Sequence, residues 1–81
     1  MSLTLLGKPG CSLCDKMDDV VQRVVGTRLP LQHADVRSDP DWLQRYRYEI
    51  PVLLWEGQEI ARHRITEEEL RERLASLGVP V

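Results

Sequence analysis

The chain has 81 residues, of which 42% are hydrophobic and 30% are charged, and its formal net charge is −2. This length supports one small core, so we expect a single domain over residues 1–81. Charges of both signs are mixed along the chain, and no apolar run approaches the roughly 20 residues that span a bilayer. The N-terminus also lacks the pattern of a secretory signal. We therefore expect a soluble, cytoplasmic protein with no nucleic-acid or membrane partner.

The first predicted elements are a strand and a long helix. A short apolar run, Leu3 to Leu6, precedes a turn-forming segment that contains Gly7, Pro9 and Gly10, as is typical of a buried strand. From Cys11 onward, apolar residues recur at helical spacing until Gly26, which is suited to capping a helix. The expected buried face of this helix consists of Leu13, Met17, Val20, Val21, Val24 and Val25.

The middle of the chain predicts a strand followed by a short helix. Residues 29–36 are interpreted as an edge strand, where Pro30 is tolerated. Asp39 before Pro40 is typical of a helix N-cap with proline at the first helical position. Pro51 disfavours helical dihedrals at Ile50, so this second helix must end before that residue.

Two further strands and a helix complete the predicted order. Residues 52–55 form a continuous apolar run typical of a central strand, residues 56–59 predict a turn, and Ile60 and Ala61 predict the next strand. A final helix should begin after Thr66, because Glu69 completes a capping box with it. Ile65 and Leu70 are suited to a hydrophobic staple, and the expected buried stripe of the helix is Leu70, Leu74 and Leu77.

The only two cysteines of the chain form a Cys-x-x-Cys motif at the start of the first predicted helix. Unpaired backbone N–H groups and the helix dipole favour a thiolate at this position. Such thiols have pKa values of about 3.5–7.5, against about 8.5 for a free cysteine. We therefore predict thiol–disulfide exchange, in which Cys11 attacks the substrate and Cys14 resolves the mixed disulfide.

The surrounding charges favour the same division of roles. Lys8 places a positive charge near Cys11, whereas the carboxylates of Asp15, Asp18 and Asp19 lie closer to Cys14. We expect a low pKa for Cys11 and a normal or raised pKa for Cys14.

Other interpretations of these residues stay open at this stage. The two cysteines can instead be small buried apolar residues. A zinc site within the chain is disfavoured, because the only further candidate ligands of the cysteine–histidine type, His33 and His63, lie in unrelated segments. We therefore expect no metal site.

Several polar and aromatic residues also have two interpretations. Lys8 is either functional or a solvated turn residue. Arg62 and Arg64 either recognise an acidic partner or protect an edge strand from aggregation, and we favour the second role. The aromatic residues are expected to pack in the core and at its edge, and they are Trp42, Tyr46, Tyr48 and Trp55.

The order of elements, the Cys-x-x-Cys after the first strand and the Ile50-Pro51-Val52 sequence before the third together resemble the glutaredoxin-like branch of the thioredoxin-fold family. The resemblance spans essentially the whole chain. It implies an α/β fold of βαβαββα order, with a four-stranded mixed sheet flanked by three helices. It also implies a monomeric disulfide oxidoreductase that acts on protein disulfides or on low-molecular-weight thiols.

The resemblance further assigns a substrate site. Pro51 should take the cis peptide bond beside Cys11, and Lys8 matches the lysine that glutaredoxins place near the thiolate and the glutathione carboxylate. The predicted substrate-binding residues are Lys8, Ser12, Ile50 and Pro51. No resident cofactor is expected, and glutathione is a candidate co-substrate.

The chain also departs from the family pattern. It has Cys-Ser-Leu-Cys where glutaredoxins commonly have Cys-Pro-Tyr-Cys, so the resemblance supplies no redox potential. Residues 60–66 lack the Gly-Gly with which the family binds the γ-glutamyl end of glutathione. The alternative function is a non-catalytic binding module, for a protein partner or for a cluster bridged between two chains with an external thiol on each side.

Overall fold

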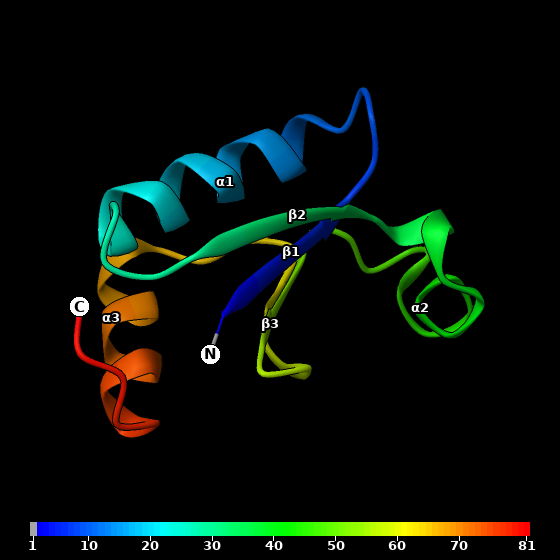
Figure 1. Ribbon diagram of the computed structural model, residues 1–81. Helices are drawn as coiled ribbons and strands as arrows, with labels where there is room; N and C mark the ends of the chain where they lie inside the picture. Colours follow the sequence, from blue (N-terminus) through cyan, green and yellow to red (C-terminus); the bar gives the residue numbers. More distant parts are fainter. Residues whose placement is uncertain (1) are drawn as a thin grey trace.

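The computed structural model describes residues 2–81, which form a four-stranded mixed sheet and three α-helices (Figure 1). The strand order is β2-β1-β3-β4, with β1 parallel to β2 and antiparallel to β3, and with β3 antiparallel to β4. This architecture confirms the predicted fold class. The strands are β1 (Leu3–Gly7), β2 (Leu31–Asp35), β3 (Val52–Trp55) and β4 (Gln58–Arg62).

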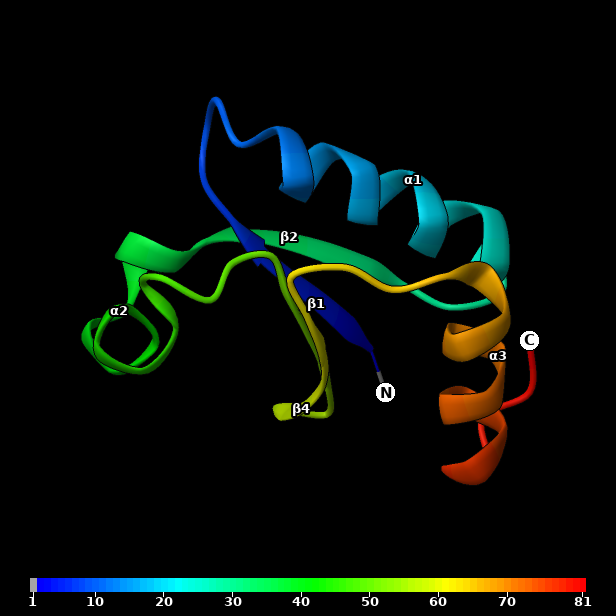
Figure 2. The ribbon, with the colours of Figure 1, turned by 180° about the vertical axis from the view of Figure 1, so that it is seen from behind.

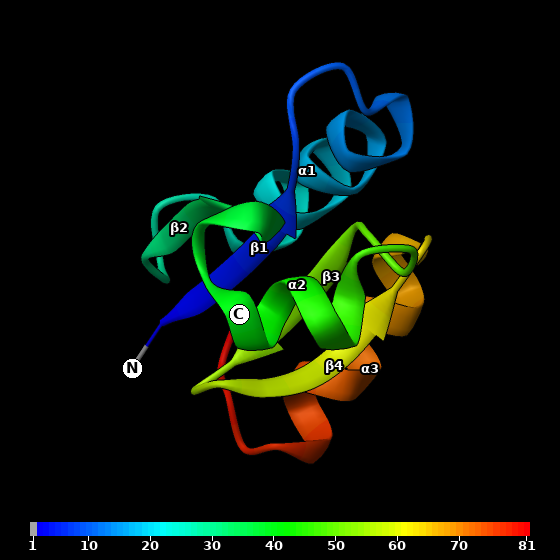
Figure 3. The ribbon, with the colours of Figure 1, turned by 90° about the vertical axis from the view of Figure 1, so that its right-hand side faces the viewer.

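The helices cover both faces of the sheet. They are α1 (Ser12–Val25), α2 (Pro40–Tyr46) and α3 (Glu67–Ser76), and a short 3-10 helix, η1 (Val36–Ser38), precedes α2. Figure 3 shows α2 in front of the sheet, with α3 behind it. Figure 2 shows the segment between β4 and α3 running beneath α1.

Two apolar clusters lie on the two faces of the sheet because successive strand residues point in opposite directions. Leu5 of β1 and Leu53 of β3 pack with α1 and α3 on one face, where Val21 and Leu70 are fully buried. The α2 face has a smaller cluster, formed by Leu6, Val36, Tyr46, Val52 and Leu54. The alternation along β1 and β3 therefore determines which helix each side chain meets.

The predicted helix signals are confirmed where the hydrogen bonds are local. Asp39 accepts hydrogen bonds from the backbone N–H groups of Asp41 and Trp42 at the start of α2. At the start of α3, Thr66 and Glu69 form the expected capping box, with both hydrogen bonds at 3.1 Å. These contacts satisfy N–H groups that have no partner within the helix.

The structure corrects the predictions for the start of β4 and for the burial of Leu13 and Leu77. Strand β4 begins at Gln58 rather than Ile60, because Glu56 and Gly57 both have positive φ values and make a two-residue hairpin turn. Leu13 lies in the first turn of α1 and is 43% exposed rather than buried. Leu77 is equally exposed because α3 ends at Ser76 and Leu77 only caps it.

The edge strand is shorter than predicted. β2 lies at one edge of the sheet, as expected, but it covers only Leu31–Asp35, and Val36 already belongs to η1. Asp35 causes this change of direction by accepting a hydrogen bond from the backbone N–H of Arg37. Within residues 2–81, no helix is long and apolar enough to cross a membrane.

Candidate functional site

The two cysteines are joined by a disulfide at the N-terminus of α1, with their Cα atoms 5.2 Å apart. The helix was predicted from Cys11 onward, but Cys11 caps it with extended dihedrals and α1 begins at Ser12. The Cys11 Sγ accepts the backbone N–H of Cys14 at 3.2 Å. A charge on this sulfur would therefore meet a backbone donor and the positive end of the helix dipole.

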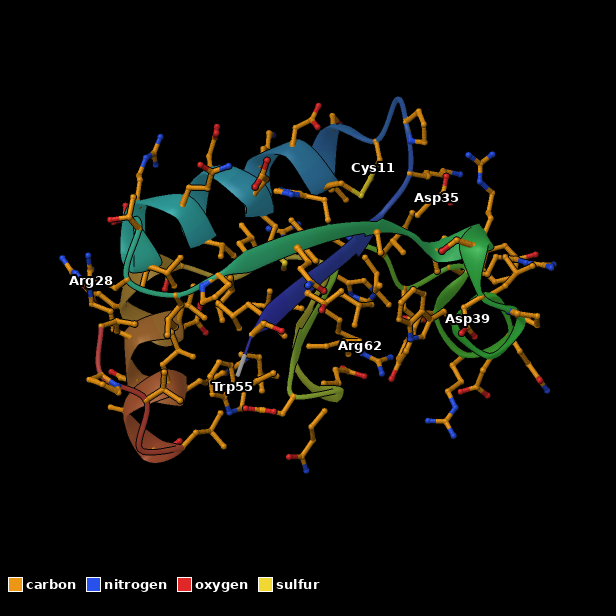
Figure 4. All side chains as sticks on the ribbon, in the orientation of Figure 1. Cys11, Arg28, Asp35, Asp39, Trp55 and Arg62 are labelled. Atoms are coloured by element: carbon orange, nitrogen blue, oxygen red, sulfur yellow. A yellow bond between two sulfur atoms is a disulfide. The ribbon has the colours of Figure 1, made fainter. Side chains whose placement is uncertain are left out.

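The two sulfurs differ in exposure. Cys11 is partly exposed, whereas Cys14 is buried, with only 7% of its surface accessible. Ser12 is exposed between them. Only Cys11 is therefore open to a substrate disulfide in this arrangement. Figure 4 shows the disulfide at the end of the molecule where Asp35 also lies.

Cys14 packs against Gly7, the last residue of β1. A Cβ atom at Gly7 would lie 3.0 Å from the Cys14 Sγ and 3.1 Å from the Cys14 Cβ. Glycine is thus required here by close approach and not by backbone conformation, since the φ of Gly7 lies outside the left-handed region. In the sequence Gly7 appears only as a turn signal, because no local pattern places Cys14 beside it.

An open cleft of about 290 Å³ lies beside Cys14, between α1 and the edge strand β2. Asp18 of α1 and His33 of β2 meet in it, with the His33 Nε2 2.8 Å from the Asp18 Oδ1. Burial raises the pKa of Asp18, but the hydrogen bonds from His33 and Gln22 outweigh burial and hold that pKa below its ordinary value. This pair was not predicted, because its members are 15 residues apart in the sequence.

Asp35 lines the same cleft and pairs with Arg37. The two side chains form a bidentate pair at 2.9 and 2.6 Å. This contact, with the backbone N–H of Arg37, lowers the pKa of Asp35 to about 2. Asp35 therefore stays ionised throughout the neutral range.

Pro51 precedes β3 at the same end of the sheet as the cysteines. The Ile50–Pro51 peptide bond is cis. The β1–β3 register pairs Leu6 with Val52, so Pro51 lies next to the point where β1 leaves the sheet toward the Cys-x-x-Cys segment. Pro51 is fully buried, and Ile50 is half-buried against the smaller core cluster.

A polar cluster holds the segment before Pro51. Glu49 contacts the Nε2 of His63 at 2.6 Å and Arg62 at 3.3 Å, and the His63 N–H donates to the Pro51 carbonyl oxygen. Arg62 also pairs with Glu59, and this hydrogen bond lowers the pKa of Glu59. Arg62 therefore has partners within the chain itself. The role of Glu49 was not predicted, because its partners follow it by 13 and 14 residues.

Lys8 lies between the cleft at Cys14 and a second hollow. It lines the cleft, and it also lines a groove of about 450 Å³ together with Arg37, Arg47 and Tyr48. Tyr48 is 83% exposed, so the expectation that it packs in the core or at its edge was wrong. The Arg47 guanidinium lies 5.7 Å from the centre of the Tyr48 ring. The structure thus places three cations and one exposed ring around this groove.

Within residues 2–81, histidine, cysteine and carboxylate side chains do not gather into a metal site. Across the described part of the chain, no three of them lie close enough to hold an ion. His33 and His63 each contact a single carboxylate, from different parts of the fold.

Solved structures with the same fold include three bacterial proteins. A structural-genomics target protein from X. campestris has a TM-score of 0.78 at 22% identity, covering 93% of this chain and 97% of its own. A protein from Nitrosomonas europaea has a TM-score of 0.73 at 19% identity, covering 88% and 87%. Thioredoxin 1 from Thermosipho africanus has a TM-score of 0.65 at 19% identity, covering 95% and 93%. These similarities establish a thioredoxin-like fold.

The family assignment comes from the sequence match. Residues 2–75 match the model of the glutaredoxin-like domain (DUF836), which is nearly the whole chain. The fold and the paired cysteines at the start of α1 agree with that match, and they are consistent with a redox function. The chain therefore belongs to the glutaredoxin-like domain family.

Proposed function

We propose that the protein is a thiol–disulfide oxidoreductase in which Cys11 is the nucleophile and Cys14 the resolving thiol. The observation that carries this proposal is the disulfide between a partly exposed Cys11 and a buried Cys14 at a helix N-terminus. The helix end stabilises the thiolate of Cys11, and burial disfavours a thiolate at Cys14. The two thiols thus have different tasks.

The reaction has two exchanges. The Cys11 thiolate attacks one sulfur of the substrate disulfide, forms a mixed disulfide and releases the other substrate sulfur as a thiolate, which takes a proton from solvent. Cys14 then loses its proton and attacks Cys11, which releases the second substrate thiol and forms the Cys11–Cys14 disulfide. The substrate gains two electrons and the protein loses two.

The proposed substrate site lies along Ile50 and Pro51. Among residues 2–81, the backbone N–H and C=O of Ile50 have no hydrogen-bond partner. A segment of the substrate can therefore pair with this backbone in an extended conformation. The contacts of Glu49 with Arg62 and His63 support this role because they fix the residue before Ile50. Ser12, exposed between the cysteines, would border the same substrate.

Lys8 and Arg47 are suited to an anionic substrate. Because both line one groove, and Lys8 also lines the cleft at Cys14, a carboxylate of glutathione or of an acidic peptide would be attracted close to the reacting sulfurs. No resident cofactor is proposed.

A redox titration tests the proposed function. The protein would be equilibrated across a series of reduced-to-oxidised glutathione ratios and quenched by alkylation at low pH. The mass of the intact protein is then measured by mass spectrometry. We expect one transition that removes two hydrogens and is absent in Cys11→Ser. A stable glutathione adduct of the wild-type protein, or two free thiols at every ratio, would contradict the dithiol mechanism.

The groove requires a separate measurement. Lys8→Gln should raise the KM for oxidised glutathione by about two- to fivefold, as loss of one exposed ionic contact predicts. The KM for an uncharged hydroxyethyl disulfide should stay the same. Arg71→Gln is the matched control, because Arg71 is an exposed cation paired with Glu67 on α3. If Lys8→Gln changes the KM for both disulfides equally, the groove does not bind the anionic part of the substrate.

A further inference from the structure

The proposed mechanism requires Cys14 to lose a proton in a place that disfavours its thiolate. Cys14 is largely buried and packs against Gly7, and burial disfavours the charged form of a thiol. The carboxylates of Asp15, Asp18 and Asp35 line the cleft beside it and oppose a second negative charge. A base in the cleft that accepts the Cys14 proton would therefore speed resolution.

The cleft contains one side chain suited to this task. The groups that face it are Asp15 and Asp18 from α1, His33 and Asp35 from β2, and Lys8 from the turn after β1. Near neutrality a lysine is protonated and has no lone pair to accept with, and a carboxylate is a weak base. Imidazole is the side chain that ordinarily exchanges protons between pH 5 and 8.

Asp18 orients His33 for proton acceptance. When the Nε2–H of His33 donates to the Asp18 carboxylate at 2.8 Å, the neutral ring keeps its lone pair on Nδ1. The same contact fixes the orientation of the ring. His33 is on the α1-facing side of β2, opposite Leu5, which is two residues before Gly7.

Water can connect the two side chains. The cleft has a volume of about 290 Å³, whereas one water occupies about 30 Å³ of liquid, so several molecules fit. Its lining supplies carboxylates, an imidazole and an ammonium group as hydrogen-bond partners for that water.

We propose that His33, held by Asp18, accepts the Cys14 proton through water in this cleft while Cys14 resolves the mixed disulfide. The Cys14 sulfur bonds to Cys11, the Cys11–substrate bond breaks, and the substrate sulfur leaves with the electron pair. The proton moves to His33 and then to solvent. His33 thereby sets the rate of the second exchange and not that of the first. This inference rests on the proposed function.

Ellman's reagent separates the two exchanges. Less than one equivalent is mixed with the reduced protein in a stopped-flow instrument, and each exchange releases one coloured thiolate. The first release reports the attack by Cys11 and the second reports resolution by Cys14. Cys14→Ser should show the first release alone. If the wild-type second release does not require Cys14, the proposed function fails and the role of His33 fails with it.

The test of His33 is the pH profile of the second release from pH 5 to 9. For the wild-type protein this rate should rise as the imidazole loses its proton. His33→Gln should slow the second release by at least about tenfold at pH 7, leave the first release unchanged, and converge with the wild-type rate near pH 5. Gln22→Ala is the matched control, because it removes another hydrogen bond to the Asp18 Oδ1 while keeping the imidazole, and its profile should match the wild type.

Two outcomes would overturn the role of His33 while the proposed function stands. One is a Cys14-dependent second release that is as fast in His33→Gln as in the wild type at pH 7. The other is a slowing by the same factor at every pH, which would indicate a structural role.

Discussion

Gly7→Ala should destabilise the protein because its new methyl group meets Cys14. The Cβ would lie 3.0 Å from the Cys14 Sγ and 3.1 Å from the Cys14 Cβ, whereas non-bonded carbon contacts are optimal at about 3.5–4.0 Å. Since Cys14 belongs to the first turn of α1, its Cβ can give way only if that turn shifts by a few tenths of an ångström. Such overpacking costs about 1–3 kcal/mol.

The sign of the effect distinguishes this contact from backbone entropy. Without the contact, alanine at a position of unstrained φ stabilises a protein by about 0.4–1 kcal/mol, because it restricts the unfolded chain. For a chain of this size, a loss of 1–3 kcal/mol corresponds to a fall in Tm of roughly 5–20 °C. Urea unfolding of the reduced wild-type and Gly7→Ala proteins measures the difference.

A double-mutant cycle identifies the partner. In a Cys14→Ala background the Sγ contact is gone and only the Cβ contact stays, so the cost of Gly7→Ala should be smaller. All four proteins are kept reduced, so that the disulfide does not differ among them. An unchanged cost in the two backgrounds, or a Gly7→Ala protein as stable as the wild type, would refute the reasoning.

Three further predictions concern the capping box, acid stability and the reactive thiol. Thr66→Ala removes the hydroxyl that accepts the Glu69 N–H, so it should lower the free energy of unfolding by about 0.5–2 kcal/mol. Urea titrations measure this loss, with Thr27→Ala, at an exposed position, as the control. An unchanged unfolding midpoint in Thr66→Ala would contradict the prediction. The pKa of Asp35 is lowered to about 2 by its hydrogen bonds from Arg37, so its contribution is present above about pH 4 and is lost as the pH falls toward 2. Asp35→Asn should therefore flatten the loss of stability across that range, and an equally steep loss in this variant would show that other carboxylates cause it. In Cys14→Ser, the alkylation rate of Cys11 should show its inflection below pH 7.5, whereas an inflection near pH 8.5 would indicate an ordinary thiol.

The sequence predicted those parts of the fold that rest on local contacts. The caps Asp39 and Thr66 lie within three residues of the N–H groups they accept, so their pattern is visible along the chain. The β3 run 52–55 was predicted with its observed bounds, because a central strand buried on both faces is continuously apolar. The boundary of β4 was missed, because Glu56 takes a left-handed conformation that is unusual for its residue type.

For the site, the sequence by itself determined that two cysteines three residues apart lie at the start of a helix, because a Cys-x-x-Cys motif and helical periodicity are both short-range patterns. Only the tertiary structure decided what surrounds Cys14. The parallel pairing of β1 with β2 places His33 opposite Leu5, and the packing of α1 on that edge places Asp18 against His33. These contacts join residues far apart in sequence, so their geometry depends on strand register and helix packing, which no local pattern specifies.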